Sequence, residues 1–127
     1  MKKTEIKILD GIWSIKVKEV VGYKCEYCKR SSIRLNACHI VGRRHRGTRW
    51  GAWLKNAKGK DYYDLCGFCG CFDCHNHYDE HGPKEKLIRE KVVGTERYEK
   101  IRQKALYEVA KNQDFEVIQN DLLNYKK

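Results

Sequence analysis

Apolar positions in residues 8–21 fit two different periods. Leu9, Trp13 and Val17 recur every four residues, as on one face of a helix, and Asp10 is a possible N-cap. The same stretch also alternates between Trp13 and Val17, and the Asp-Gly pair that begins at position 10 is typical of hairpin turns. The pattern alone therefore leaves both a helix and a hairpin open for this segment.

The middle of the chain predicts short strands separated by a loop. Residues 35–41 are rich in β-prone side chains and predict a first strand, and residues 62–65 predict a second strand that pairs back on it. Between them, residues 42–60 are rich in glycine and arginine and predict a loop. Residues 74–93 have a helical pattern that the only proline, Pro83, interrupts.

Two amphipathic helices are predicted in the last third of the sequence. Thr95 is a suitable N-cap for the first of them. The apolar stripe of the first helix comprises Tyr98, Ile101, Ala105, Leu106 and Val109. The stripe of the second helix comprises Phe115, Ile118, Leu122 and Tyr125. Helices at both ends with short strands between them indicate an α+β fold, and we expect the two stripes to pack against the rest of the domain.

The composition indicates one small domain. The chain has 127 residues, of which 41% are apolar, and this allows one core of modest size. No stretch approaches the run of about 20 apolar residues that a membrane-spanning helix needs, and the charged N-terminal residues lack the apolar centre of a signal peptide. We therefore expect a cytoplasmic protein that has no membrane partner.

Positive charge is concentrated in one segment. The net charge is +10, and residues 29–60 contain ten lysines and arginines and no acidic residue. Such a segment can neutralise phosphates and release their counterions, so its composition is typical of a DNA-binding surface. Charge alone equally allows a solvated basic loop.

Seven cysteines, six of them in closely spaced pairs, indicate metal binding. The pairs are Cys25/Cys28, Cys66/Cys69 and Cys71/Cys74. An odd number of cysteines without an export signal argues against a disulfide framework, whereas two C-x-x-C pairs a few dozen residues apart form the tetrahedral thiolate site that Zn²⁺ prefers. A structural zinc would add about 10 kcal/mol or more of folding free energy, which would compensate for a small core.

Three pairs compete for four ligand positions. We favour Cys71/Cys74 as the partner of Cys25/Cys28, because His75 follows it directly. Cys66/Cys69 is the rival pair. We expect Cys38, the odd cysteine, to be a small buried strand residue.

Two histidines and an asparagine lie in an order that suits phosphodiester hydrolysis. They are His39 at the end of the predicted first strand, Asn56 in the loop and His75 after the last cysteine pair. Hydrolysis requires a base to activate water, a divalent cation to stabilise negative charge and positive groups to hold the backbone. An imidazole suits the base, and the position of His39 between two cysteine pairs favours this over an ordinary structural histidine.

Several stretches of the sequence resemble the zinc-stapled HNH nucleases carried by phages and prophages. These stretches are Cys25-Glu-Tyr-Cys28, Leu35-Asn-Ala-Cys-His39-Ile-Val-Gly-Arg-Arg44, Thr48-Arg-Trp50, Asn56 and Cys71-Phe-Asp-Cys74-His75. The residues around Leu9 and Trp13 also resemble the amphipathic helix that precedes the first cysteine pair in that family, and this favours a helix. The resemblance covers most of the chain.

The resemblance implies the fold of this family, the ββα-metal or His-Me finger. In that fold a short β-hairpin and a helix grip one catalytic ion, and a separate zinc site of four cysteines staples them. The expected single HNH nuclease domain spans residues 1–127. It comprises a leading helix at 8–22, a zinc and ββα-metal core at 25–93 and C-terminal helices at 95–127.

The resemblance also implies an activity, hydrolysis of phosphodiester bonds in duplex or branched DNA. By position, His39 corresponds to the general base of the family, Asn56 to the loop asparagine that orients this base, and His75 to the ligand of a catalytic divalent ion such as Mg²⁺, Mn²⁺ or Ni²⁺. Such an enzyme would be encoded by a phage or prophage and act in the cytoplasm of a bacterial host, with a homodimer allowed.

The arginines of the basic segment are the expected DNA contacts. Arg43, Arg44 and Arg49 lie beside the expected site, and a guanidinium grips phosphate through paired hydrogen bonds. Trp50 and Trp53 flank the same loop. They either stack on DNA or close a small core over the zinc.

Two departures from the family pattern leave a second interpretation open. Cys38 lies where many HNH enzymes carry Asp or His as a metal ligand, and the spacing from Asn56 to Cys71 is longer than usual. A non-catalytic zinc-finger protein that binds DNA is therefore the alternative. His77 and His81, four residues apart, are candidate additional ligands of the catalytic ion.

Overall fold

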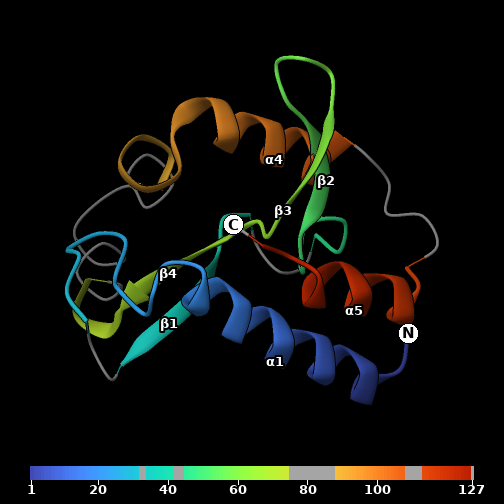
Figure 1. Cartoon of the computed structure of the whole chain (residues 1–127), viewed down its shortest axis with the longest axis horizontal. Coiled ribbons are helices and arrows are strands. Elements are labelled where there is room, and N and C mark those ends of the chain that lie inside the picture. Colours follow the sequence, from blue (N-terminus) through green and yellow to red (C-terminus); the bar gives the residue numbers. More distant parts are fainter. Residues whose placement is uncertain (32–33, 42–44, 75–87, 108–112, 127) are drawn as a thin grey trace.

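The computed structural model describes residues 1–31, 34–41, 45–74, 88–107 and 113–126, and these form an α+β fold (Figure 1). Its elements in chain order are α1 (Lys3–Glu19), β1 (Leu35–His39), β2 (Ala52–Lys55), β3 (Asp61–Asp64), β4 (Gly67–Cys71), the short π-helix η1 (Ile88–Val93), α4 (Thr95–Tyr107) and α5 (Phe115–Leu123). Within these ranges, no helix is long and apolar enough to cross a membrane.

The segment with two competing periods is a helix, α1, which begins five residues before the expected start and ends at Glu19. Leu9, Trp13 and Val17 form its buried stripe, and this agrees with their four-residue spacing. Asp10 is not the N-cap, because the helix continues through it. Instead Glu5 accepts a hydrogen bond of 2.8 Å from the Lys2 backbone N–H at the start of the helix.

Two antiparallel sheets of two strands each form the centre of the molecule, and their pairing differs from the prediction. Strand β1 pairs with β4, so that Leu35 lies opposite Cys71 and His39 opposite Gly67. Residues 61–64 do not pair with β1. They form β3 and pair with β2, which lies in the segment that was predicted to be a loop.

Both missed strands have a physical explanation. Strand β2 buries Ala52 and Leu54 and exposes Trp53 and Lys55, a strand alternation that the surrounding glycines and arginines obscured. Strand β4 has the sequence Gly-Phe-Cys-Gly-Cys, which carries little intrinsic strand preference. It is a strand because both of its faces are buried by the rest of the molecule, and not because its residues prefer the β conformation.

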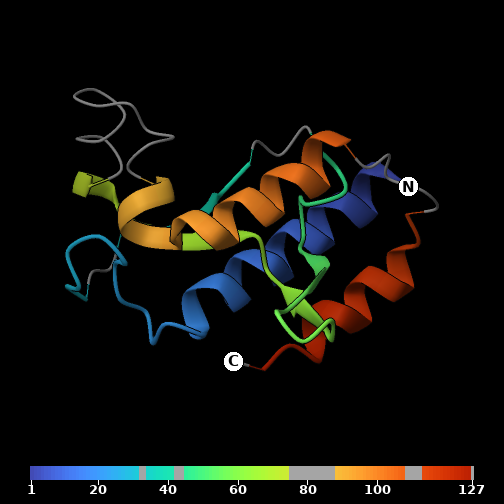
Figure 2. The ribbon, with the colours of Figure 1, turned by 90° about the horizontal axis from the view of Figure 1, so that it is seen from above.

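Two hydrophobic clusters lie on opposite faces of the β1–β4 sheet. Alternate residues point to opposite faces, so Cys38 and Phe68 pack with Tyr98 and Ile101 of α4, whereas Cys69 packs with α1 and α5. In Figure 1, α4 lies above the β1–β4 sheet and α1 lies along the lower side of the molecule, and α4 lies nearest the viewer when the molecule is seen from above in Figure 2.

The two predicted C-terminal helices are present. In α4, Tyr98 and Ile101 are buried as expected, whereas Leu106 is 43% exposed. In α5, Leu122 is fully buried, and the Asp114 side chain caps the helix by accepting hydrogen bonds from the N–H groups of Glu116 and Val117.

Candidate metal centre

Four thiols from two distant segments converge beside the end of β4. Cys25 and Cys28 come from the loop after α1, Cys71 ends β4, and Cys74 lies in the helical turn Phe72–Cys74 that follows. Their sulfur atoms all lie within 4.8 Å of one another, and Cys28 Sγ is 3.9 Å from Cys71 Sγ. A tetrahedral zinc with Zn–S bonds of about 2.3 Å requires sulfurs about 3.8 Å apart. The four cysteines could therefore hold a metal ion such as zinc.

Backbone hydrogen bonds shape the first cysteine loop and fasten it to β4. Cys25 N–H donates to Arg30 O at 3.0 Å, and Lys29 N–H donates to Cys25 O at 2.8 Å. Glu26 N–H donates to Cys69 O at 2.8 Å, and the Glu26 carboxylate accepts a hydrogen bond of 2.6 Å from Cys69 N–H. The two bonds between Glu26 and Cys69 hold the loop beside the end of β4, where Cys71 lies close to Cys25 and Cys28.

The electrostatics of the cluster suit a dication. A hydrogen bond from Arg30 lowers the pKa of Cys28 to about 6, so this thiol ionises readily. Burial, followed by the hydrogen bonds that the Cys74 thiol donates to Cys71 and Cys28, raises the pKa of Cys74 above its usual value. Four sulfurs this close oppose each other's ionisation, and a bound Zn²⁺ would remove that opposition because it stabilises thiolates.

Among the residues that the structure describes, the rival pair Cys66 and Cys69 is not part of a group of close metal ligands. Cys66 packs in the cluster that contains Tyr98 and Ile101 of α4, whereas Cys69 packs in the cluster that contains Leu9 and Trp13 of α1. Burial raises the pKa of Cys66 well above its usual value and that of Cys69 to about 11, so both thiols are neutral at physiological pH. Cys38 is 7% exposed within the first cluster, as expected for a buried strand residue.

His39 lies at the end of β1 and faces α1. Its ring stacks on Trp13, with the ring centroids 4.1 Å apart and the planes at 13°, and its Nε2 atom is enclosed. Trp13 is itself held by a hydrogen bond of 2.7 Å from its Nε1 to Leu65 O. The imidazole is thus half-buried with its orientation fixed by the indole.

Asn56 has a structural task at the turn between β2 and β3. Its side-chain oxygen accepts hydrogen bonds from the backbone N–H groups of Lys58 and Lys60, at 2.9 and 3.0 Å. This hairpin points away from β1 in Figure 1. The structure therefore does not bring Asn56 to His39, and the bonds are those of a side chain that shapes its own turn.

Of the expected DNA contacts, Arg49 is engaged within the protein. It donates hydrogen bonds of 3.1 and 2.8 Å to the two carboxylate oxygens of Asp10, and its side chain is only 15% exposed. Trp50 Nε1 donates a third bond to Asp10, at 2.7 Å. Arg43, Arg44, His75, His77 and His81 lie outside the described residues.

Asp10 holds the side chains of Arg49 and Trp50 in place, and the sequence did not indicate these contacts. Burial alone would raise the pKa of its carboxyl, but hydrogen bonds from Arg49 and Trp50 outweigh burial and lower it, and the charge of nearby His39 adds to this. Since Asp10 and Trp13 are one helical turn apart, α1 holds both the end of the basic loop and the ring of His39. The only sequence signal was that Asp10 lies mid-helix between two buried residues.

The two tryptophans of the loop have different surroundings. Trp50 is 1% exposed and belongs to the cluster under α1, which agrees with the core interpretation. Trp53 is 50% exposed, and its Nε1 lies 3.2 Å from the carboxylate of Asp121 on α5. Trp53 could therefore contact a ligand, whereas Trp50 could not.

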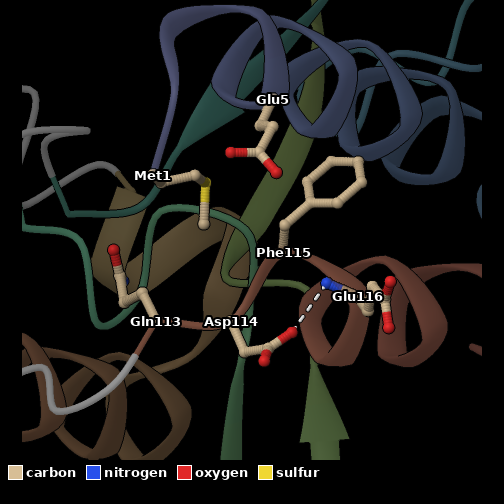
Figure 3. A pocket seen from close by; sticks show the side chains of 6 residues that line it. All are labelled: Met1, Glu5, Gln113, Asp114, Phe115 and Glu116. Carbon is tan, nitrogen blue, oxygen red and sulfur yellow. Dashed lines mark hydrogen bonds between the residues drawn. The ribbon is translucent and has the colours of Figure 1, made fainter.

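A separate hollow of about 450 Å³ lies where α1 and α5 begin (Figure 3). Three carboxylates, of Glu5, Asp114 and Glu116, line it. The first two accept hydrogen bonds at the starts of the helices, Glu5 from the Lys2 N–H and Asp114, as the figure shows, from the Glu116 N–H. This acidic hollow therefore needs no ligand to explain it.

Comparisons of the chain with family models, with curated proteins and with solved structures found no match.

Proposed function

We propose that this chain is a metal-dependent DNA endonuclease of the HNH type, with a structural zinc on Cys25, Cys28, Cys71 and Cys74. The observation that carries the proposal is the convergence of these thiols at the end of the β1–β4 pair, just where a helical turn begins. Strand, strand and helical turn in this order, tied by four cysteines and with a histidine ending the first strand, are the parts that a ββα-metal finger needs.

In this proposal His39 is the general base that accepts a proton from water. Because Nε2 is enclosed, the proton acceptor is Nδ1, and the Trp13 ring keeps the imidazole in one orientation. A rigid support of this kind lowers the entropic cost of aligning base and phosphate.

His75 would hold the catalytic divalent ion, with Mg²⁺, Mn²⁺ or Ni²⁺ as candidates. When bound, this ion supplies positive charge to the scissile phosphate and the leaving oxygen. His75 follows Cys74 directly, so the zinc site fixes the origin of the segment that carries it. His77 and His81 remain candidate additional ligands. Asn56 has no part in this mechanism, because its side chain shapes the β2–β3 turn.

DNA is the proposed partner, and the net charge of +10 supports it. Arg43 and Arg44 keep their proposed role as phosphate contacts. Arg49 is better assigned to positioning, because its guanidinium is bound to Asp10 and stacked 5.3 Å from the Trp50 ring. It therefore ties the basic segment to α1 and does not contact the DNA backbone in this proposal.

One observation favours the second candidate, a zinc-containing DNA-binding protein without catalysis. The enclosed Nε2 and the stacking on Trp13 are also what a purely structural histidine would show. In that case the cysteines and basic residues would serve recognition alone.

Cleavage of supercoiled plasmid by the zinc-loaded protein separates the two candidates. The endonuclease should convert plasmid only after Mg²⁺, Mn²⁺ or Ni²⁺ is added, and His39→Ala should abolish conversion while zinc content and DNA affinity are retained. Binding without conversion under every added ion would leave the non-catalytic candidate.

A further inference from the structure

We infer that one side of α1 is a second DNA-backbone surface, which we name the α1 lysine face. It is formed by the exposed Lys3, Lys7 and Gly11 and the half-buried Ser14 and Lys18. The inference rests on the proposed function for its partner, but it concerns a different part of the chain from the basic segment 29–60. It begins from the finding that Arg49, expected to contact DNA, is bound to Asp10. A further phosphate contact beside Arg43 and Arg44 must then come from another part of the chain.

The α1 lysine face is free of negative charge. At about 100° per residue, its members share about 80° of the helix circumference. All three acids of α1 lie elsewhere and are engaged: Glu5 accepts from Lys2 N–H, Asp10 holds Arg49, and Glu19 pairs with Lys16 at 3.9 Å. None of the ion pairs found among the described residues involves the three lysines of the face.

The face also borders the candidate catalytic residue. On the helix, Asp10 lies between the lysines and the buried stripe that contains Trp13. Asp10 binds Arg49 and Trp50, and Trp13 of the buried stripe stacks on His39, the last residue of β1. A duplex that lies along the lysines of α1 would therefore pass close to His39. The span from Lys3 to Lys18 is about 22 Å, close to two-thirds of a turn of B-DNA.

Gly11 gives the face a flat centre. Glycine inside a helix costs about 1 kcal/mol relative to alanine, so a packing or functional reason is expected. Packing supplies none, because a Cβ at Gly11 would meet no atom within 4 Å and the residue is exposed. Close approach of a rod-like polyanion to the helix backbone supplies a reason.

The test compares two triple variants by their DNA affinity at several salt concentrations, using zinc-loaded protein, a short fluorescent duplex and no added Mg²⁺ or Mn²⁺. One variant replaces Lys3, Lys7 and Lys18 with Gln. The matched control replaces three exposed lysines that lie outside both the α1 lysine face and residues 29–60, namely Lys24, Lys91 and Lys126.

The α1 variant should lower the slope of log affinity against log salt by about 1 for each lysine that contacts a phosphate, while the control variant should change it by less than about 1. Equal changes in both variants, or an unchanged slope in the α1 variant, would overturn the inference. This experiment measures binding alone, and the plasmid assay measures cleavage separately. A wild-type protein that binds DNA but does not cut plasmid would contradict only the endonuclease proposal. Cutting with an unchanged slope would contradict only the α1 surface.

A single-residue version guards against misfolding of the triple variant. Gly11→Glu places a negative charge at the centre of the face without a steric clash, and Gln103→Glu adds the same charge on the exposed side of α4. Gly11→Glu should weaken DNA binding several-fold more than Gln103→Glu, with the melting temperature kept. Equal affinities would count against the inference.

Discussion

Asp64 is a buried carboxylate at the corner between β3 and β4. Arg97 of α4 donates hydrogen bonds of 2.6 and 2.8 Å to it, and the same carboxylate accepts a bond of 2.8 Å from Cys66 N–H. Cys66 has a φ of 56°, a left-handed conformation that is unfavourable for a residue other than glycine. The Asp64 side chain thus joins α4 to the strained residue from which β4 starts.

Replacing Asp64 with Ala should destabilise the protein by about 2–3 kcal/mol, because it leaves Arg97 and a strained backbone without their acceptor. Asp61→Ala is the matched control. It breaks the exposed ion pair with Lys55, whose loss should cost less than about 1 kcal/mol. Urea unfolding at a fixed free zinc concentration measures both, and equal losses would contradict the role given to Asp64.

Replacing Gly67 of β4 or Gly11 of α1 with Ala should change the free energy of unfolding in opposite directions. A Cβ at Gly67 would overlap Trp13 Cζ2 and press on Val17, so Gly67→Ala should cost about 1–3 kcal/mol. Gly11→Ala enters open space in a helix and should stabilise the protein by up to about 1 kcal/mol. Thermal unfolding of both variants checks this, and a neutral Gly67→Ala would show that Trp13 does not pack as described.

Single residues were the least predictable level of the site. Asn56 and Arg49 have suitable chemistry for catalysis and DNA binding, but their partners are a local turn and an aspartate 39 residues away. Residue type and spacing show what a side chain can do. They do not show which group it meets, because that depends on long-range packing.

At the scale of elements, α5 packs against α1 and covers the hydrophobic cluster that contains Leu9 and Trp13. Leu122 is fully buried there, whereas its neighbour Leu123 is 53% exposed. Leu122→Ala should cost about 2–5 kcal/mol of unfolding free energy through lost burial and a new cavity. Leu123→Ala should change it by less than about 0.5 kcal/mol. Chemical denaturation distinguishes the pair, and similar values would mean that α5 does not dock as described.

The C-terminal helices were predictable because their signal is local, as the helical spacing of Tyr98 and Ile101 in α4 illustrates. Leu9, Trp13 and Val17 of α1 have the same spacing, but the alternation in this segment also allowed a hairpin, and only the family resemblance favoured a helix. The strands were only partly predictable. Pairing of β1 with β4 depends on contacts between distant segments, and nothing in the glycine- and cysteine-rich sequence of β4 indicates a strand.

At the scale of the whole molecule, the thiol cluster links the loop after α1 to the end of β4. The pairing of Cys25/Cys28 with Cys71/Cys74 was predictable from spacing, together with the histidine that follows Cys74. The separation of Cys66 from Cys69 was not, because it follows from long-range packing, which places these two side chains in separate clusters.

The zinc-loaded protein should contain one zinc per chain. Cys28→Ala and Cys74→Ala should lose it, whereas Cys38→Ala and Cys66→Ala should retain it, as native mass spectrometry can measure. A chelator should lower the melting temperature of the wild type, since metal binding is coupled to folding. Loss of zinc in Cys66→Ala with retention in Cys74→Ala would contradict the assigned ligands.

The most direct test of the central claim is the single-turnover cleavage rate of plasmid DNA by wild type, His39→Ala and His45→Ala, with added Mg²⁺ or Mn²⁺ and zinc content measured on the same samples. Removing a general base typically costs about 10²–10⁴ in rate. We predict such a loss for His39→Ala, with zinc and DNA affinity kept, and a much smaller change for His45→Ala. A His39→Ala variant that cuts at the wild-type rate would contradict the account.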